Sequence, residues 1–131
     1  MKPDLTVIKV GTGVLTRELD GQLDRASLVR LVTAVAAVIA AGNRCIMVSS
    51  GAVGAGISAL GLSAYPSDVP TKQACASVGQ TRLMHNYESL FQNFDLKVAQ
   101  LLLTADDLEQ PDRSSRVTDT LSRLLAVPSI V

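Results

Sequence analysis

Residues 7–15 read Val-Ile-Lys-Val-Gly-Thr-Gly-Val-Leu. The β-branched residues predict a strand that brings Lys9 to its carboxyl end, after which the chain turns through Gly11 and Gly13. Ligands of open α/β sheets bind outside the carboxyl ends of the strands, so a cation and unobstructed backbone N–H groups at this position predict a site for an anion. The alternative is a buried strand that ends in an ordinary turn, with Lys9 solvated at the edge of the sheet.

The sequence after this stretch predicts a βαβ unit. Asp24 is placed to cap a helix, and Leu23 and Leu28 have the spacing of a hydrophobic staple. Apolar residues then recur at helical intervals until Gly42, which suits the position just after a helix. Residues 44–48 form a short run of strand composition. This strand should lie parallel to the first, because a whole helix separates the two.

A second bend with small side chains follows the second strand. Residues 48–56 read Val-Ser-Ser-Gly-Ala-Val-Gly-Ala-Gly, which predicts a strand end, a serine–glycine turn and a glycine-rich helix that continues to Leu60. The free N–H groups of such a helix start attract anions, and the small side chains leave room for a ligand. The alternative is that the glycines allow close packing between helix and strand. The two interpretations are compatible, and both stay open at this point.

The rest of the sequence continues the alternation of helix and strand. The predicted elements are, in chain order, a loop over 62–70, a helix over about 71–93, a strand over 97–103, a helix over 113–126 and the beginning of a fourth strand over 128–131. This alternation, with right-handed crossovers, predicts an α/β sandwich with a mainly parallel sheet. Such a sheet would gather the bends at 9–13 and 49–51, together with Thr104, at one edge.

Four residues in the predicted helices have competing interpretations. Gly79 costs about 1 kcal/mol relative to alanine inside a helix, so it marks either a break or a close approach. His85, the only histidine, has no second histidine or cysteine at ligand spacing, which favours a surface or packing role over a metal ligand. Asp106 and Asp107 follow Thr104 and resemble acids in the first turn of a capped helix. Such carboxylates can also hold Mg²⁺ through water.

Composition limits the class of protein. The 131 residues suffice for one domain with a core, and they are 47% hydrophobic, 18% charged and 3% aromatic, with a formal net charge of zero. This composition excludes a disordered chain. It also argues against a nucleic-acid partner, because binding to nucleic acid uses excess positive charge or aromatic stacking platforms.

Cysteine usage and hydropathy predict a cytoplasmic protein. Cys45 and Cys75 are far apart in apolar surroundings, as expected of small buried residues in a reducing compartment. Residues 1–4 lead directly into a strand and lack the features of a signal peptide. No apolar run reaches the ~20 residues that span a bilayer, so no membrane partner is expected.

Several common motifs are missing from the sequence. It contains no G-x-x-x-x-G-K-[ST], which excludes a P-loop protein. Residues 11–16 lack the third glycine of the dinucleotide fingerprint and are not expected to lead directly into a helix, which disfavours a dinucleotide fold. Neither Ser49 nor Ser50 lies in a G-x-S-x-G nucleophile elbow. No set of metal ligands is predicted.

Five segments of the sequence resemble one family of kinases. They are Val-Ile-Lys-Val-Gly-Thr-Gly-Val-Leu-Thr at 7–16, Val-Ser-Ser-Gly-Ala-Val-Gly-Ala-Gly at 48–56, Lys-Gln-Ala-Cys-Ala-Ser-Val-Gly-Gln at 72–80, Ala-Gln-Leu-Leu-Leu-Thr at 99–104 and Asp-Thr-Leu at 119–121. Their order and spacing are similar to those of the glutamate 5-kinases in the amino acid kinase superfamily. The resemblance implies a three-layer α/β sandwich with a mainly parallel sheet, the amino acid kinase (carbamate kinase-like) fold, in truncated form.

The resemblance also implies a reaction. Glutamate 5-kinases transfer the γ-phosphoryl group of ATP, with Mg²⁺, to the side-chain carboxylate of L-glutamate, which gives glutamyl 5-phosphate for proline biosynthesis. Lys9 would neutralise charge on the transferring group, in a reaction that depends mostly on positioning and charge neutralisation. By the same resemblance Gly11, Thr12 and Gly13 form the phosphate loop next to Lys9, and Ser50, Gly51 and Ala52 hold the glutamate.

The resemblance is to the amino-terminal part of that family. The resemblance implies that residues 1–131 correspond to the glutamate-binding part of the kinase domain and that the nucleotide-binding half is absent. Gly13 stands where the family usually has serine. Two other functions stay open: a sister kinase with another acceptor, and a non-catalytic binding module. A sheet that ends after four strands leaves an open edge, so a homo-oligomer is also expected.

Overall fold

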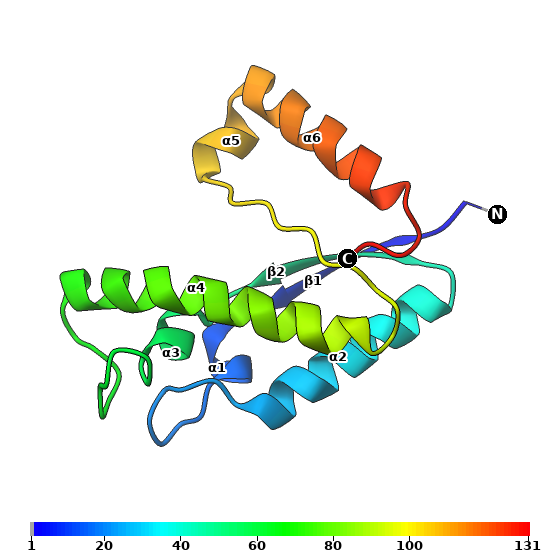
Figure 1. Cartoon of the computed structure of the whole chain (residues 1–131). Helices are drawn as coiled ribbons and strands as arrows, with labels where there is room; N and C mark the ends of the chain where they lie inside the picture. The colour runs from blue at the N-terminus through cyan, green and yellow to red at the C-terminus, as the bar shows by residue number, and fades with distance from the viewer. Residues whose placement is uncertain (1) are drawn as a thin grey trace.

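The computed structural model describes residues 2–131 (Figure 1). These residues form six helices and one parallel sheet of two strands. The strands are β1 (Leu5–Val10) and β2 (Arg44–Ser49). The helices are α1 (Thr12–Leu15), α2 (Arg25–Ala40), α3 (Ala52–Gly56), α4 (Val69–Gln92), α5 (Ala105–Glu109) and α6 (Pro111–Leu125). The predicted α/β class with a parallel sheet is confirmed. Within residues 2–131, the helices are all too short or too polar to cross a bilayer.

The register of the two strands decides which side chains reach the core. β1 and β2 run parallel, with Lys9 opposite Val48 and Val10 opposite Ser49. Side chains alternate between the two faces of a strand, and Val10 packs in the hydrophobic core at 3% exposure. The exposed side chain of Lys9 therefore lies on the face of the sheet that points away from the core.

Helices α2 and α4 cover the core face of the sheet. The largest fully buried side chains of the core cluster come from α1, α2, β2 and α4, and they are Leu15, Leu28, Val32, Val35, Cys45, Leu83 and Phe91. Both ends of α2 are as predicted. The carboxylate of Asp24 accepts hydrogen bonds from Ala26 N and Ser27 Oγ, at 3.3 and 2.7 Å, and Gly42 follows the helix with φ +92°. Helix α2 connects the two parallel strands, which confirms the βαβ unit.

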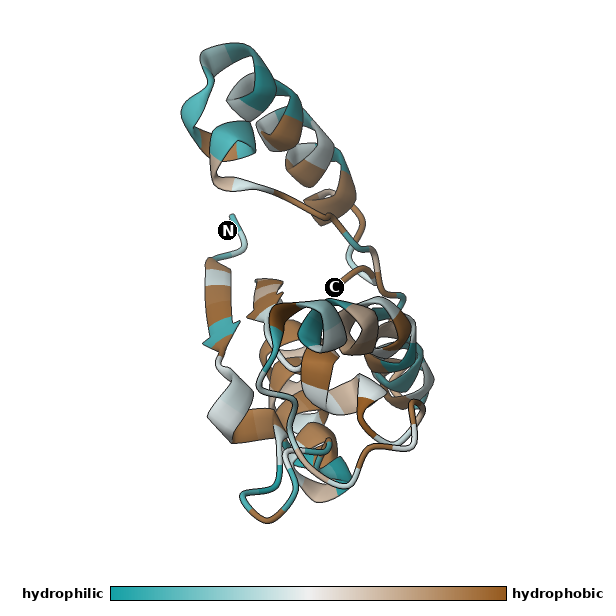
Figure 2. Ribbon diagram, turned by 90° about the vertical axis from the view of Figure 1, so that its left-hand side faces the viewer, coloured by the Kyte–Doolittle hydropathy of each residue, from teal (hydrophilic) through white to brown (hydrophobic). Residues whose placement is uncertain are grey.

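Within residues 2–131, no helix packs along the length of the other face of the sheet. Leu5, Val7 and Val48 are about half exposed there. Helices α5 and α6 stand apart from the rest of the chain (Figures 1 and 2), and their firmest link to the sheet is a hydrogen bond from Arg44 Nε to the carbonyl oxygen of Leu125, at 2.8 Å. In this chain the third layer of the expected sandwich is therefore incomplete.

The predicted third and fourth strands, over 97–103 and 128–131, are not formed. Lys97 N donates to Ser129 O and Ala99 N to Val131 O, which gives one isolated parallel bridge between Lys97 and Ile130. A strand obtains its backbone hydrogen bonds from a neighbour along its length. Residues 97–99 have such a neighbour, whereas residues 100–103 have none within the described chain, so strand composition alone did not make a strand.

The structure also differs from the predictions at α1, α3 and the start of α4. The predicted turn through Gly11 and Gly13 contains a short helix, α1, whereas no helix directly follows residues 11–16, as predicted, because α2 begins only at Arg25. Helix α3 ends at Gly56 instead of continuing to Leu60. Helix α4 begins at Val69, slightly before the predicted 71, because the Asp68 carboxylate accepts from Thr71 N at 2.9 Å and a proline is favourable in the first turn.

The carboxylates that cap the helices should make the stability of the fold sensitive to acid. Hydrogen bonds from Thr71 hold the pKa of Asp68 below its usual 3.8, and the hydroxyl of Ser27 lowers the pKa of Asp24. A carboxylate whose pKa is lower in the folded state stabilises the fold above its unfolded pKa, and this contribution is lost as the pH falls through the folded pKa. The melting temperature should therefore be flat between about pH 5 and 7 and fall below about pH 4.

Circular dichroism melts across this pH range would test the expectation. Asp68→Asn is the matched variant, because asparagine still caps a helix but does not titrate. Its melting temperature should fall less steeply with acid than that of the parent chain. Equal slopes would show that Asp68 does not contribute to acid sensitivity.

Candidate functional site

The two predicted bends meet at the carboxyl ends of the strands. Ser50 N donates a hydrogen bond to the carbonyl oxygen of Val10, at 3.0 Å, one residue before Gly11. Because β1 and β2 are parallel and in register up to Val10 and Ser49, both bends leave the sheet at the same edge. The structure therefore brings the first bend and the Ser50–Gly51 bend side by side.

Lys9 lies one residue before this junction. Its side chain is exposed, and it makes no hydrogen bond or ion pair with residues 2–131. A cation without a protein partner at the carboxyl end of a strand is available to a ligand of opposite charge. An exposed Lys9 agrees both with the predicted anion site and with the alternative of a solvated lysine at an ordinary turn, so its role in binding stays a prediction.

The backbone after Lys9 is open to a ligand. Helix α1 begins at Thr12, and Gly11 at its N-cap supplies no side-chain acceptor. The N–H groups of Thr12 and Gly13 make no hydrogen bond with other described residues. A Cβ added at Gly11 or Gly13 would meet no atom within 4 Å. Free N–H groups beside a cation in open space match the needs of a phosphate group.

The second bend depends on a glycine. Gly51 has φ +105° and ψ 2°, a left-handed conformation that glycine adopts without steric cost. It is buried, whereas Ser50 is exposed and Ala52 is partly buried. The turn at Gly51 therefore directs the chain from β2 into α3 and leaves the polar side chain of Ser50 at the surface.

Three glycines hold α3 against its neighbours, and we call them the glycine contact: Gly54, Gly56 and Gly79. A Cβ at Gly54 would overlap the carbonyl oxygen of Gly21, and one at Gly56 would overlap that of Cys75. A Cβ at Gly79 would overlap the carbonyl oxygen of Ala52 and lie 2.7 Å from Gly56 N. The glycine-rich segment is therefore closely packed, but against α4 and the turn at Gly21 and not against a strand as predicted. Gly79 marks a close approach rather than a break.

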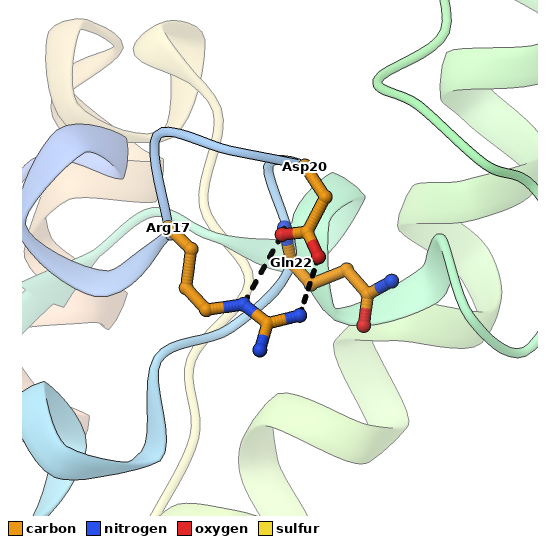
Figure 3. A network of polar contacts seen from close by, with 3 residues as sticks. All are labelled: Arg17, Asp20 and Gln22. Atoms are coloured by element: carbon orange, nitrogen blue, oxygen red, sulfur yellow. Dashed lines mark hydrogen bonds and ion pairs between the residues drawn. The ribbon is translucent and has the colours of Figure 1, made fainter.

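A polar turn supports α3 from the other side (Figure 3). Arg17 and Asp20 form an ion pair, in which Arg17 Nε donates to Asp20 Oδ1 at 3.1 Å. Gln22 N donates to the same oxygen, also at 3.1 Å, and Gly21 between them has φ +73°. The hydrogen bonds from Arg17 and Gln22 lower the pKa of Asp20. This turn presents the Gly21 carbonyl oxygen that Gly54 approaches, so it fixes one side of α3.

A hydrogen bond from α4 to the end of β2 was missed by the sequence analysis. The hydroxyl groups of Ser49 and Tyr87 lie 2.6 Å apart. Burial raises the pKa of Tyr87, and the hydrogen bond with Ser49 acts in the opposite direction. The sequence placed Tyr87 only on the apolar face of a helix. The available signal was its hydroxyl group, since a buried tyrosine usually finds a hydrogen-bond partner.

Tyr87→Phe should lower the free energy of unfolding by about 1 kcal/mol, because it removes this hydrogen bond and keeps the ring in the core. Urea unfolding followed by circular dichroism measures the change. Tyr65→Phe is the matched control, since Tyr65 is 45% exposed and its hydroxyl group bonds no described residue. An equal loss in both variants would argue against a structural role for the Ser49–Tyr87 contact.

Among the remaining polar candidates, Thr104 and Asp107 have a structural role. Asp107 Oδ2 accepts from Thr104 N at 2.8 Å and Thr104 Oγ1 accepts from Asp107 N, which forms a capping box and lowers the pKa of Asp107. The capping interpretation is therefore confirmed. His85 is exposed on α4, and Cys45 and Cys75 are buried free thiols. Residues 2–131 contain no group of three or more His, Cys, Asp or Glu that could hold a metal ion.

Comparison with known proteins shows similarity to the amino acid kinase family and to glutamate 5-kinases. The sequence profile of the amino acid kinase family matches residues 4–131. Glutamate 5-kinase of a Geobacter species is 50% identical over 120 residues, which are 92% of this chain and 32% of that protein. Glutamate 5-kinase of Symbiobacterium thermophilum is 47% identical over 120 residues, 92% of this chain and 45% of that protein. That of Bifidobacterium adolescentis is 46% identical over 127 residues, 95% of this chain and 33% of that protein.

These relatives are longer than this chain. It spans between 32% and 45% of their length, and the match lies in their amino-terminal part. The region matched by the family profile, residues 4–131, includes both bends at the edge of the sheet.

Proposed function

Because this chain belongs to the amino acid kinase family, we propose that it is the amino-terminal, glutamate-binding part of a glutamate 5-kinase. The observation that carries the proposal is the junction of the two bends, where Ser50 N donates to Val10 O next to the unpaired cation Lys9. A phosphoryl donor and an acidic acceptor must meet in such a reaction. Adjacent bends, one with a cation and one with a free serine, supply a place for each.

In this proposal the first bend handles the transferring phosphoryl group. ATP supplies that group, and its oxygens accept from the free N–H groups of Thr12 and Gly13. Lys9 neutralises the negative charge that the oxygens carry during transfer, which is the main demand of this chemistry. Gly11 and Gly13 leave the approach open, since a Cβ at either would meet no atom within 4 Å.

The second bend holds the acceptor. Ser50 presents its hydroxyl group, and Gly51 and Ala52 present backbone groups at the start of α3, to L-glutamate. In this proposal, the binding site for the base of ATP lies in the part of the relatives that this chain does not match. Mg²⁺, which neutralises phosphate charge in such reactions, usually takes one or two carboxylates and keeps several waters. The described residues offer no carboxylate cluster for it, so the roles above are assigned to protein groups alone.

The reaction can be tested in a chimera of residues 1–131 and the part of the Geobacter relative that follows its matched region. With ATP, Mg²⁺ and hydroxylamine, an acyl phosphate is trapped as a hydroxamate. Glutamate should give the product, and aspartate should give much less. A nucleoside monophosphate should give none, since only carboxylates form acyl phosphates.

The outcome separates the proposal from its two competitors. Product with aspartate in place of glutamate would favour a sister kinase with another acceptor. Glutamate binding by calorimetry without any turnover in the chimera would favour a non-catalytic binding module. Proline biosynthesis as the pathway follows only if glutamate is the preferred acceptor.

A further inference from the structure

Three oxygen atoms link α4 to the second bend. The hydroxyl group of Tyr87, on α4, lies 2.6 Å from Ser49 Oγ, and Ser49 Oγ lies 3.0 Å from the carbonyl oxygen of Ser50. A carbonyl oxygen can only accept a hydrogen bond, so Ser49 donates its single hydroxyl proton to Ser50 O. Ser49 therefore accepts from Tyr87, and the hydrogen bonds run in one direction, from Tyr87 through Ser49 to Ser50.

The strand register explains why α4 can reach this bend. Ser49 is the last residue of β2 and pairs with Val10, whose side chain packs in the core. Paired residues of parallel strands point to the same face, so Ser49 points toward the face that α4 covers. Tyr87 is 4% exposed, and its ring lies beside that of Phe91, with 6.3 Å between the ring centroids. The core packing of Tyr87 therefore holds its hydroxyl group at the end of β2.

The backbone of Ser50 is held on both sides. Its N–H donates to the carbonyl oxygen of Val10, at 3.0 Å, and its own carbonyl oxygen accepts from Ser49 Oγ. Strand β1 thus fixes one side of residue 50, and α4 fixes the other through Ser49. The side chain of Ser50 is exposed and makes no hydrogen bond with residues 2–131. These contacts set the direction of the Ser50 hydroxyl group and leave it available to a ligand.

The same hydrogen bond orients the next peptide group. The peptide bond between Ser50 and Gly51 is trans, so the N–H of Gly51 points away from the carbonyl oxygen that Ser49 holds. Gly51 is buried, and its N–H makes no hydrogen bond with the described residues. A buried backbone N–H usually has a partner, which an acidic ligand would supply. Ser50 Oγ and Gly51 N are thus two free donors beside a peptide group that Ser49 and Tyr87 hold in place.

We propose that Tyr87, acting through Ser49, is a positioning residue for the acidic acceptor at the second bend. It touches neither the acceptor nor ATP. It holds the peptide group in the orientation that directs Ser50 Oγ and Gly51 N toward the acceptor. Without the hydroxyl group of Tyr87, Ser49 Oγ is free to rotate, and the acceptor must order the bend as it binds, which weakens its binding. This inference rests on the proposed function, because that function assigns the acceptor to this bend.

A contact that only fastens α4 to β2 would give a different result. Its removal would lower the fraction of folded enzyme, which reduces the apparent kcat and leaves both KM values unchanged. A positioning role predicts that the KM for glutamate rises. The KM for ATP should stay the same, because the phosphoryl group of ATP is assigned to the first bend. The two KM values therefore distinguish positioning from a purely structural contact.

The experiment measures both KM values in the chimera with the hydroxamate assay. Tyr87→Phe and Ser49→Ala should each raise the KM for glutamate about tenfold and leave the KM for ATP unchanged. The double variant should match Ser49→Ala alone, because Tyr87 acts through Ser49. Ser49→Thr keeps a hydroxyl group and should retain most of the affinity for glutamate. Ile39→Val is the control for stability, because Ile39 packs against the core near the end of α2, away from the bends, and it should change neither KM.

The inference is overturned if Tyr87→Phe changes the KM for glutamate no more than Ile39→Val does, or if the double variant is clearly worse than Ser49→Ala. An active parent chimera with either result would reject the positioning role and keep the kinase function. If the parent chimera makes no hydroxamate, the same variants are compared by calorimetry, and Tyr87→Phe should raise the Kd for glutamate about tenfold. A parent chimera that neither phosphorylates nor binds glutamate would overturn both proposals.

Discussion

Gly79→Ala should lower the free energy of unfolding by about 3 kcal/mol or more. Alanine is favoured over glycine inside a helix by about 1 kcal/mol, so helix propensity alone would predict that the substitution raises the free energy of unfolding. The added Cβ, however, would overlap the carbonyl oxygen of Ala52 and lie 2.7 Å from Gly56 N. Backbone atoms cannot rotate out of the way as a side chain can. Helix α3 must therefore move away from α4. The energetic cost of this overlap is larger than the gain in helix propensity from alanine.

Urea unfolding followed by circular dichroism would measure this loss. The matched control is Gly13→Ala, the same substitution in a helix where the Cβ meets no atom within 4 Å. It should change stability by no more than about 0.5 kcal/mol. If Gly79→Ala were as stable as Gly13→Ala, α3 would not be held by the glycine contact.

In the chimera, Lys9→Ala should reduce kcat by about 10²- to 10³-fold, while the KM for glutamate changes little. We expect kcat to fall without a change in the KM for glutamate because Lys9 lies at the first bend, whereas glutamate is assigned to the second. Because the side chain is exposed and makes no hydrogen bond with residues 2–131, its removal should leave the fold intact. A steady-state assay at saturating ATP measures both constants.

Two further variants make the Lys9 result specific. Lys2→Ala removes another exposed lysine away from the site and should leave kcat unchanged. Lys9→Arg keeps the charge with a different shape and should retain part of the activity. A Lys9→Ala chimera with parental kcat would remove Lys9 from the proposed mechanism.

The parts of the fold that the sequence predicted are those encoded by neighbouring residues. The cap at Asp24 and the glycine at position 42 act within one turn of the helix that they limit, so their residue types were sufficient evidence. The position of Lys9 near the end of β1 followed in the same way from the β-branched residues around it. What these residues bind stays a prediction.

The parts that the sequence did not predict depend on distant partners. Residues 97–103 have strand composition, but a strand also needs a neighbour, and composition does not reveal which neighbour is present. The Ser49–Tyr87 hydrogen bond joins residues 38 positions apart, so no local pattern signals it. Gly79 was ambiguous for the same reason, because its contact, Ala52, lies on another helix.

The pairing of β1 with β2 also limits how the length of this chain can vary. Because successive side chains alternate between faces, deletion of one residue before Lys9 in β1 would turn Lys9 into the core and Val10 into solvent. An inserted residue beside Leu19, at the tip of a surface turn, would shift no strand. Homologues should accordingly differ in length at that tip and keep the spacing between residue 5 and the first bend constant.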